Sequence, residues 1–161
     1  MSSTEWFQRA PEPAVDLTAG WSVTPSMTAD LTRLRHDLAA LVERSRPVVD
    51  KTELDELLLV FEELASNGLR HGQPPVQVVV VAIPTGWLLD VSDAAAESPP
   101  VPSHHRDPAT GGMGLSLVAV LSAAHGWIVD GGRKHIWARL AAGSPTPGSG
   151  STVVPTPRAP A

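Results

Sequence analysis

The stretch from Asp50 to Gly72 constrains the fold most strongly, because its apolar residues recur with the spacing of one helix face. These residues are Leu54, Leu57, Leu58, Phe61, Leu64, Ala65, Gly68 and Leu69. At about 100° per residue they fall within one arc of about 140°. The sequence therefore predicts a helix that begins at Asp50 or Thr52 and ends at Gly72, just before Pro74-Pro75. A helix with so wide an apolar stripe must bury it against a second layer.

The rest of the chain supplies a sheet that this helix can cover. Apolar and β-branched residues alternate or run together in five segments, which we predict to be strands: 15–23, 76–83, 87–93, 126–129 and 135–140. Two further helices are predicted, from Ser26 or Thr28 to about Arg46 and from about Leu115 to Ala124. We expect an α/β (α+β) two-layer sandwich, with helices on one face of a mixed, mainly antiparallel sheet.

Composition indicates the domain organisation and excludes several classes of protein. The chain has 161 residues, of which 42% are hydrophobic, enough for one domain. We predict a flexible leader over 1–13, a folded domain over 14–141 and a disordered tail rich in Pro, Gly, Ser and Thr over 142–161. The net charge of −5 argues against a dedicated nucleic-acid binder.

The absence of cysteine excludes disulfides and thiolate metal sites. Since no apolar run reaches the roughly 20 residues of a membrane span, we expect a cytoplasmic protein without membrane contact.

The long helix carries a second, polar stripe. Glu63, Asn67 and Arg70 follow at i, i+4 and i+7, within about 60° of one another and opposite the apolar arc. A carboxylate one turn before a carboxamide offers a proton acceptor and an oxygen ligand for a hard cation such as Mg²⁺. The alternative is an ordinary solvated helix face.

Two other features are compatible with phosphate and base recognition. The run Gly111-Gly112-Met113-Gly114 opens the third helix, where glycines allow close backbone approach and free N–H groups attract phosphate. The alternative is a plain glycine turn, and no Gly-Lys-Ser/Thr follows as in a P-loop. Asp93 ends a strand, where a carboxylate can accept a hydrogen bond from an amino group such as adenine N6. The alternative is an aspartate that starts a turn.

In this order the three features resemble the ATPase superfamily of DNA gyrase, the ninety-kilodalton heat-shock chaperones, histidine kinases and MutL, known as the GHKL or Bergerat fold. The run Glu63-Leu64-Ala65-Ser66-Asn67-Gly68-Leu69-Arg70-His71-Gly72 is similar to its N box. Asp93-Ala94-Ala95 is similar to the start of its first glycine box, and Gly112-Met113-Gly114-Leu115 to its second. The short, single-domain form resembles the anti-sigma factor serine/threonine kinases of actinobacteria.

The resemblance implies ATP and Mg²⁺ as ligands. It makes Glu63 the base that orients the attacking hydroxyl, Asn67 the Mg²⁺ ligand and Asp93 the acceptor for the adenine amino group. It makes residues 94–110 a short lid. The other nucleotide-binding positions that it implies are Arg70, His71, Gly112, Met113, Gly114 and Leu115.

The resemblance also implies an activity and partners. The activity is transfer of the γ-phosphoryl group of ATP to a serine of an anti-sigma factor antagonist, together with capture of a sigma factor. Relatives often form homodimers through the first strand and helix. The alternative is an ATP-binding sensor or scaffold with little turnover, because two residues depart from the family pattern. Ala95 stands where the family has Gly or Ser, and Gly68 stands where it has Ala. A glycine inside a helix costs about 1 kcal/mol and is expected to loosen the site.

Three further positions receive weaker interpretations. His36, followed by Asp37, is the feature that would suit a detached histidine kinase domain, although that class needs a helical dimerisation domain and only one predicted helix is available for it. The run His104-His105-Arg106-Asp107 lacks the spacing of a metal site and is expected to be a polar part of the lid. Lys134 is expected to be a solvated hairpin residue.

Overall fold

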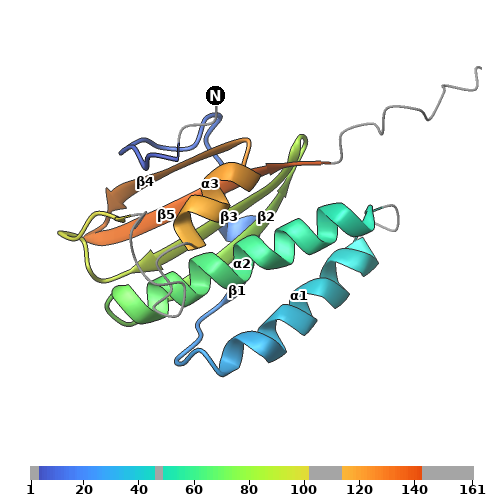
Figure 1. Cartoon of the computed structure of the whole chain (residues 1–161), viewed down its shortest axis with the longest axis horizontal. Helices are drawn as coiled ribbons and strands as arrows, with labels where there is room; N and C mark the ends of the chain where they lie inside the picture. Colours follow the sequence, from blue (N-terminus) through green and yellow to red (C-terminus); the bar gives the residue numbers. More distant parts are fainter. Residues whose placement is uncertain (1–3, 46–48, 102–113, 143–161) are drawn as a thin grey trace, which may run out of the picture.

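The computed structural model of the chain describes residues 4–45, 49–101 and 114–142. Within these ranges the elements follow in the order η1 (Leu17–Ala19), β1 (Trp21–Val23), α1 (Asp30–Ser45), α2 (Lys51–His71), β2 (Gln77–Ile83), β3 (Gly86–Asp93), α3 (Gly114–Leu121), β4 (Ala124–Asp130) and β5 (Arg133–Ala141). The strands form one sheet, and the helices α1, α2 and α3 cover one face of it (Figure 1). The predicted α+β two-layer sandwich is confirmed.

The sheet has the strand order β1-β2-β3-β5-β4, and every neighbouring pair among these described strands is antiparallel. Two of the pairs are hairpins. The β4–β5 hairpin turns at Gly131 and Gly132, whose φ angles of 56° and 75° are the positive values that a two-residue type I′ turn requires. β3 lies in the middle of the sheet and is buried along its whole length, including its last residue, Asp93.

The predicted long helix is confirmed as α2, with both of its ends where the sequence places them. The Asp50 carboxylate accepts a hydrogen bond from the Thr52 N–H at 3.2 Å and caps the amino terminus. At the other end the Gly72 N–H donates to the Gly68 carbonyl at 2.9 Å. The apolar stripe packs on the sheet, and its fully buried members include Leu57, Phe61, Leu64 and Ala65.

The structure differs from the predicted first strand. Residues 17–19 form the 3₁₀ turn η1, and only Trp21–Val23 pair with β2. The Asp16 carboxylate accepts hydrogen bonds from the Thr18 N–H at 2.9 Å and from the Thr18 hydroxyl at 2.6 Å. Such local bonds stabilise a turn at the expense of an extended chain, so they override the alternating pattern.

Residues 4–13 also differ from the expectation of a flexible leader. Gln8 forms a parallel bridge with Trp127, and the Arg9 N–H donates to the Trp127 carbonyl at 2.9 Å along the edge of β4. Trp6 is 8% exposed and belongs to the core. The buried Trp6 ring anchors this segment to the apolar core, and the backbone hydrogen bonds pair N–H and C=O groups at the exposed edge of β4.

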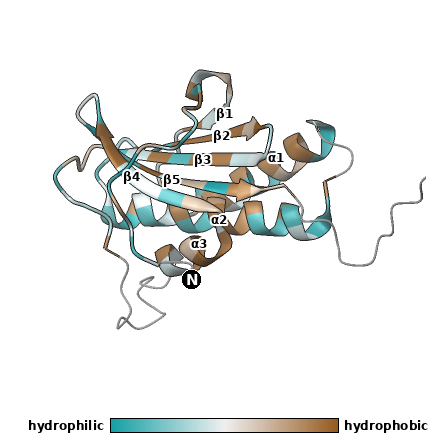
Figure 2. Cartoon of the chain, turned by 90° about the horizontal axis from the view of Figure 1, so that it is seen from above, coloured by the Kyte–Doolittle hydropathy of each residue, from teal (hydrophilic) through white to brown (hydrophobic). Residues whose placement is uncertain are grey.

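The helices differ in how hydrophobic and hydrophilic residues are distributed along them. In Figure 2, α3 is largely hydrophobic, whereas α1 and α2 alternate hydrophobic and hydrophilic residues. Such alternation is typical of helices with one face on a sheet and one in water. Among the helices of the described part of the chain, none combines the length and the apolar character that a bilayer crossing requires.

Candidate functional site

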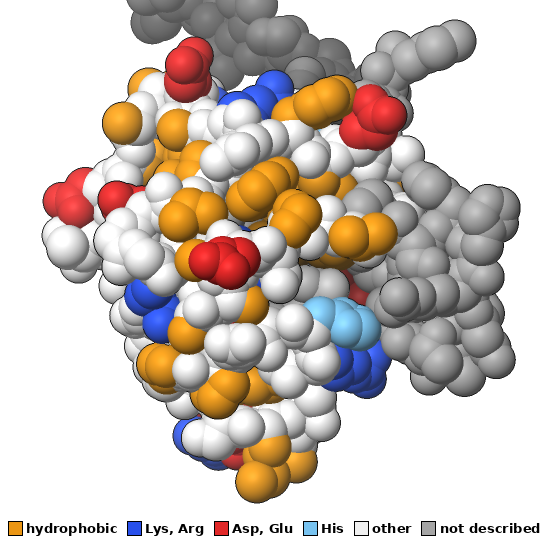
Figure 3. Space-filling model, turned by 90° about the vertical axis from the view of Figure 1, so that its left-hand side faces the viewer, with side chains coloured by type: hydrophobic (Ala, Val, Ile, Leu, Met, Phe, Trp, Pro, Cys, Tyr) orange, Lys and Arg blue, Asp and Glu red, His pale blue; other side chains and the backbone are white. Residues whose placement is uncertain are grey.

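The polar stripe of α2 lies at the end of the molecule where β3 finishes. Glu63 and Asn67 are half-buried, whereas Arg70 and His71, in the last turn of α2, are exposed. Figure 3 looks onto this end of the molecule, where a histidine and a basic side chain lie together beside a recessed carboxylate. The stripe is therefore not a uniformly solvated helix face, because its acid and amide are withdrawn from water while its cationic residues remain at the surface.

Glu63 and the first residue of α3 are in direct contact. A Cβ atom placed on Gly114 would lie 2.2 Å from Oε2 of Glu63 and 3.2 Å from its Cδ, so the carboxylate fills the space that a side chain would need. Unpaired N–H groups and the positive end of the helix dipole are features of a helix start. The contact thus brings together the acid of the N box and the glycine-opened helix, which are far apart in the sequence.

The environment of Glu63 changes its acidity. Burial raises the pKa of the Glu63 carboxyl above its ordinary value, the neighbouring charge of Glu62 raises it further, and the charge of Arg70 opposes both. A carboxylate with a raised pKa is a stronger proton acceptor. Glu63 is consequently suited to take a proton from a hydroxyl group held beside it.

Asp93 lies beside the carboxyl terminus of α2. A Cβ atom on Gly72 would be 2.6 Å from Oδ2 of Asp93, and the Ala94 N–H donates to the Gln73 carbonyl at 2.8 Å. The Asp93 side chain is 1% exposed, and its Oδ1 accepts a hydrogen bond from the Ala95 N–H at 2.7 Å. Asp93 is therefore a residue that starts a turn, as the simpler interpretation holds. It is also a buried hydrogen-bond acceptor, because its second oxygen, Oδ2, takes no part in that turn.

Lys134 is the partner of that second oxygen, and its expected solvated position is wrong. Its ammonium Nζ lies 3.4 Å from Oδ2 of Asp93 and donates to the Ser98 carbonyl at 2.9 Å, and the residue is 4% exposed. The register of β3 and β5 sets Lys134 opposite Asp93. The signal was present in the sequence, because Lys134 alternates in step with Ile136, Ala138 and Leu140, all of which are buried.

The two departures from the family pattern have structural explanations. A Cβ atom on Gly68 would lie 3.1 Å from Cγ1 of Val76 and 3.1 Å from Cγ1 of Val91, so the glycine lets α2 approach the sheet closely. This packing opposes the loosening that a helical glycine was expected to cause. Ala95 is 7% exposed, and its backbone N–H binds Asp93.

Some of the predicted site residues are not described by the structure, and one that is described, Leu115, belongs to the core. Gly112, Met113 and the run from His104 to Asp107 lie outside the described residues. Leu115 is described, and its side chain is buried in the core at 3% exposure. Its carbonyl accepts a hydrogen bond from Trp6 Nε1 at 3.3 Å.

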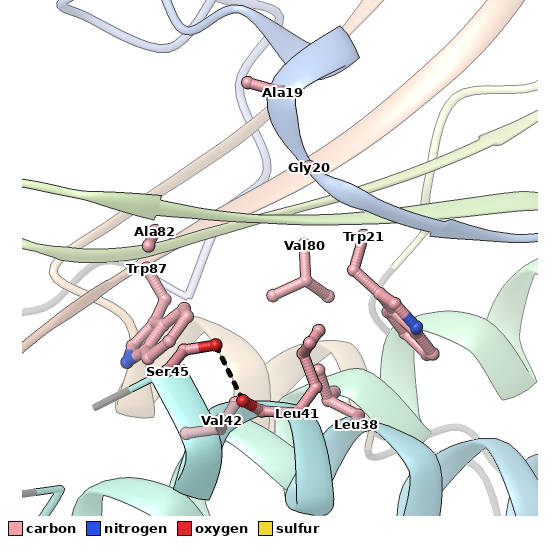
Figure 4. Close-up of a pocket in the computed structure, with 10 residues that line it drawn as sticks. All are labelled: Ala19, Gly20, Trp21, Leu38, Leu41, Val42, Ser45, Val80, Ala82 and Trp87. Carbon is pink, nitrogen blue, oxygen red and sulfur yellow. Dashed lines mark hydrogen bonds between the residues drawn. The ribbon is translucent and has the colours of Figure 1, made fainter. Parts of the chain in front are cut away.

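An apolar pocket of about 330 Å³ lies elsewhere, between α1 and the start of the sheet (Figure 4). Trp21, Leu38, Val80 and Trp87 are among the residues that line it. Trp87 belongs to the opposite end of β3 from Asp93, and the hydroxyl of Ser45 is bonded to the Leu41 carbonyl. No group of converging polar side chains lines this pocket, so it is not the candidate site.

The described residues fit a nucleotide with a divalent cation. Asn67 lies on the same face of α2 as Glu63, between the Glu63–Gly114 contact and the Gly72–Asp93 contact. The carboxyl-terminal half of α2 therefore carries an acid and an amide oxygen and ends beside the buried acceptor Asp93 of β3. Carboxylate and amide oxygens suit Mg²⁺, and the start of α3 suits phosphate.

Comparison with known proteins identifies the family of this domain. The sequence model of the family described as "Histidine kinase-like ATPase domain" matches residues 24–140. No curated protein matches the chain.

Proposed function

Because the chain belongs to the histidine kinase-like ATPase domain family, whose members bind ATP, we propose that it is a protein serine/threonine kinase of the anti-sigma factor type. It transfers the γ-phosphoryl group of ATP to a serine of an antagonist protein, and it captures a sigma factor. We place this activity in the cytoplasm, with a homodimer as its working form.

The observation that carries the proposal is the contact of the Glu63 carboxylate with Gly114. It sets a proton acceptor of raised pKa at the opening of α3, one helical turn before Asn67. Phosphoryl transfer depends on positioning and charge neutralisation more than on covalent help from the protein. A rigid helix that holds the base against the phosphate-binding helix start supplies that positioning.

Each residue of the site has a role in this proposal. Glu63 orients the serine hydroxyl and takes its proton as the oxygen–phosphorus bond to the serine forms and the bond to the β-phosphate bridging oxygen breaks. Asn67 holds Mg²⁺, which neutralises charge on the phosphates. Asp93 accepts a hydrogen bond from the adenine amine. Arg70 and His71, exposed at the rim, contact the phosphates.

A second candidate is an ATP-binding sensor or scaffold with little turnover. It is favoured by Ala95, which is buried next to Asp93 at a position where the family pattern has Gly or Ser. This candidate keeps the same ligand and the same residues for binding but has no phosphoryl transfer.

One experiment separates the two candidates. Purified protein with Mg²⁺ and ATP labelled at the γ-phosphate is mixed with the cognate antagonist, and label on serine is measured. We expect transfer by the wild type, loss of transfer in Glu63→Gln, and ATP binding retained in that variant. Glu62→Gln is the matched control, because Glu62 is exposed on the same turn of α2.

Unchanged transfer in Glu63→Gln would remove Glu63 from the mechanism. ATP binding by the wild type without transfer to the right partner would favour the sensor. A wild-type protein that is folded but does not bind ATP would contradict both candidates.

A further inference from the structure

The buried ion pair of Asp93 and Lys134 is not explained by turn formation alone. Lys134 Nζ lies 3.4 Å from Asp93 Oδ2, and both residues are more than nine-tenths buried, at 4% and 1% exposure. Removing two charges from water is costly, and a buried pair is weak support for stability by itself. Two charged groups held at the end of the central strand, beside the candidate ATP site, therefore suggest a role in binding.

The hydrogen-bonding capacity of the pair exceeds the contacts that the described residues make with it. A lysine ammonium has three N–H donors, of which the described partners take two, Asp93 Oδ2 and the Ser98 carbonyl. A carboxylate has about four lone-pair positions, and the described donors to Asp93 are the Ala95 N–H and the Lys134 ammonium. The pair can thus offer one further donor and one further acceptor side by side.

The position of the pair allows a ligand to approach it. Ser98, which the Lys134 ammonium contacts, is itself exposed, so the ammonium lies directly beneath a surface segment. On the other side, the missing side chain of Gly72 leaves the end of α2 against Asp93. The ion pair therefore lies between the surface segment at Ser98 and the carboxyl-terminal end of α2, the helix that carries Asn67.

We propose that Lys134, held beside Asp93, donates a hydrogen bond to the ring nitrogen N1 of adenine, next to the exocyclic amine N6 that the proposed function assigns to Asp93. This inference rests on the proposed binding of ATP and names the group that selects its base. Free base edges are recognised by such matched donors and acceptors. Hypoxanthine presents the reverse pattern, an N1–H donor and an O6 acceptor, so it would be repelled at both positions.

The decisive test compares two nucleotides on the wild-type protein. In 1-deaza-ATP a C–H group replaces N1, while the N6 amine and the triphosphate are unchanged. Isothermal titration calorimetry with Mg²⁺ is expected to show binding about tenfold weaker than for ATP, the loss of one charge-assisted hydrogen bond. Equal affinities for the two nucleotides would overturn the inference.

A variant then assigns the effect to Lys134. In Lys134→Met the ratio of the two dissociation constants is expected to fall to about one, because the donor to N1 is gone. The matched control is Lys51→Met, since Lys51 is an exposed lysine paired with Asp55 on α2, and it is expected to keep the tenfold ratio. A tenfold ratio that persists in folded Lys134→Met would show that another group reads N1 and would overturn the inference.

The outcomes also separate this inference from the proposed function. If ATP binds and 1-deaza-ATP binds equally well, the role of Lys134 is wrong while ATP binding stands. If the folded wild type binds neither nucleotide, the proposed function is wrong and the inference is wrong with it. Should Lys134→Met not fold, the wild-type titration decides, and Lys134→Arg, which keeps a donor and a charge, is expected to retain discrimination against 1-deaza-ATP.

Discussion

The indole Nε1 of Trp6 donates a hydrogen bond to the carbonyl of Leu115, 3.3 Å away, and so joins the amino-terminal segment to the first turn of α3. The Trp6 ring also packs against His125, with ring centroids 4.7 Å apart. The same turn of α3 begins with Gly114, which contacts Glu63. The amino-terminal segment therefore supports the helix against which the base of the candidate site is held.

We predict that Trp6→Ala destabilises the protein by about 3 kcal/mol, because it removes a buried indole and leaves a cavity beneath α3. Urea unfolding followed by circular dichroism measures the change. The neighbouring Phe7 is 53% exposed, so Phe7→Ala is the control and is expected to change stability by less than about 0.5 kcal/mol. Equal effects of the two substitutions would contradict the packing of this segment.

We predict that Gly114→Ala reduces ATP turnover by about a hundredfold with little loss of stability. The new Cβ would lie 2.2 Å from Oε2 of Glu63, which is the end of a flexible side chain and can swing away. Displacing a catalytic group by about 1 Å is enough for a loss of that size. Turnover and thermal unfolding are measured on the same preparation.

Gly131→Asn is the control for Gly114→Ala. A Cβ atom at position 131 meets no atom within 4 Å, and asparagine tolerates the positive φ of this turn. Turnover is expected to be unchanged in Gly131→Asn. Wild-type turnover in Gly114→Ala would show that the position of the Glu63 carboxylate is not important for the reaction.

The raised pKa of Glu63 predicts a stability difference that depends on pH. Because the folded-state pKa lies above the unfolded one, the folded state binds the proton more readily. The favourable contribution is present below the unfolded pKa and is lost as pH rises through the folded pKa. Glu63→Gln, which carries no charge, is therefore expected to be more stable than the wild type at neutral pH and similar to it at about pH 4.

Urea unfolding of the wild type and Glu63→Gln at both pH values measures this difference. Glu43→Gln is the control, because Glu43 is an exposed glutamate of α1 and its replacement is expected to change stability by less than about 0.5 kcal/mol at either pH. A variant that is less stable than the wild type at neutral pH would show that the charged carboxylate is stabilised by its surroundings, contrary to the direction of its pKa.

The sequence predicted the parts of the fold that depend on local periodicity. The ends of α2 at Asp50 and Gly72 follow from helix spacing and capping chemistry, which act over a few residues. The turn η1 was missed because one carboxylate, that of Asp16, overrides an alternating pattern. The burial of Trp6 contradicts the predicted flexible leader and could not be foreseen, because its partner Leu115 is 109 positions away.

The candidate site was predictable only in part. Glu63 and Asn67 share a helix face, so their common orientation follows from their spacing. The proximity of Glu63 to Gly114 depends on how α3 packs on α2, which no local pattern contains. The burial of Lys134 was not predicted because lysine is ordinarily an exposed residue, whereas here a buried carboxylate on the adjacent strand compensates its charge.

Gly68, inside α2, and Gly72, the residue that follows this helix, are predicted to differ in their tolerance of alanine. At Gly72 the new Cβ would be 2.6 Å from Oδ2 of Asp93 and 2.6 Å from the Gly68 carbonyl oxygen, which is backbone and cannot withdraw. We expect Gly72→Ala to cost about 2 kcal/mol and to weaken ATP binding. At Gly68 the nearest atoms are valine methyls at 3.1 Å, and alanine gains about 1 kcal/mol of helix propensity.

Gly68→Ala is therefore expected to lie within about 1 kcal/mol of the wild type and to bind ATP normally, since overpacking and propensity oppose each other. Urea unfolding and calorimetric titration with ATP compare the two variants. The reverse order, with Gly68→Ala more damaging than Gly72→Ala, would mean that the packing of α2 on Val91 limits the site more than its contact with Asp93. The carboxyl-terminal end of α2 would then owe its position to the core rather than to the buried acceptor at the end of β3.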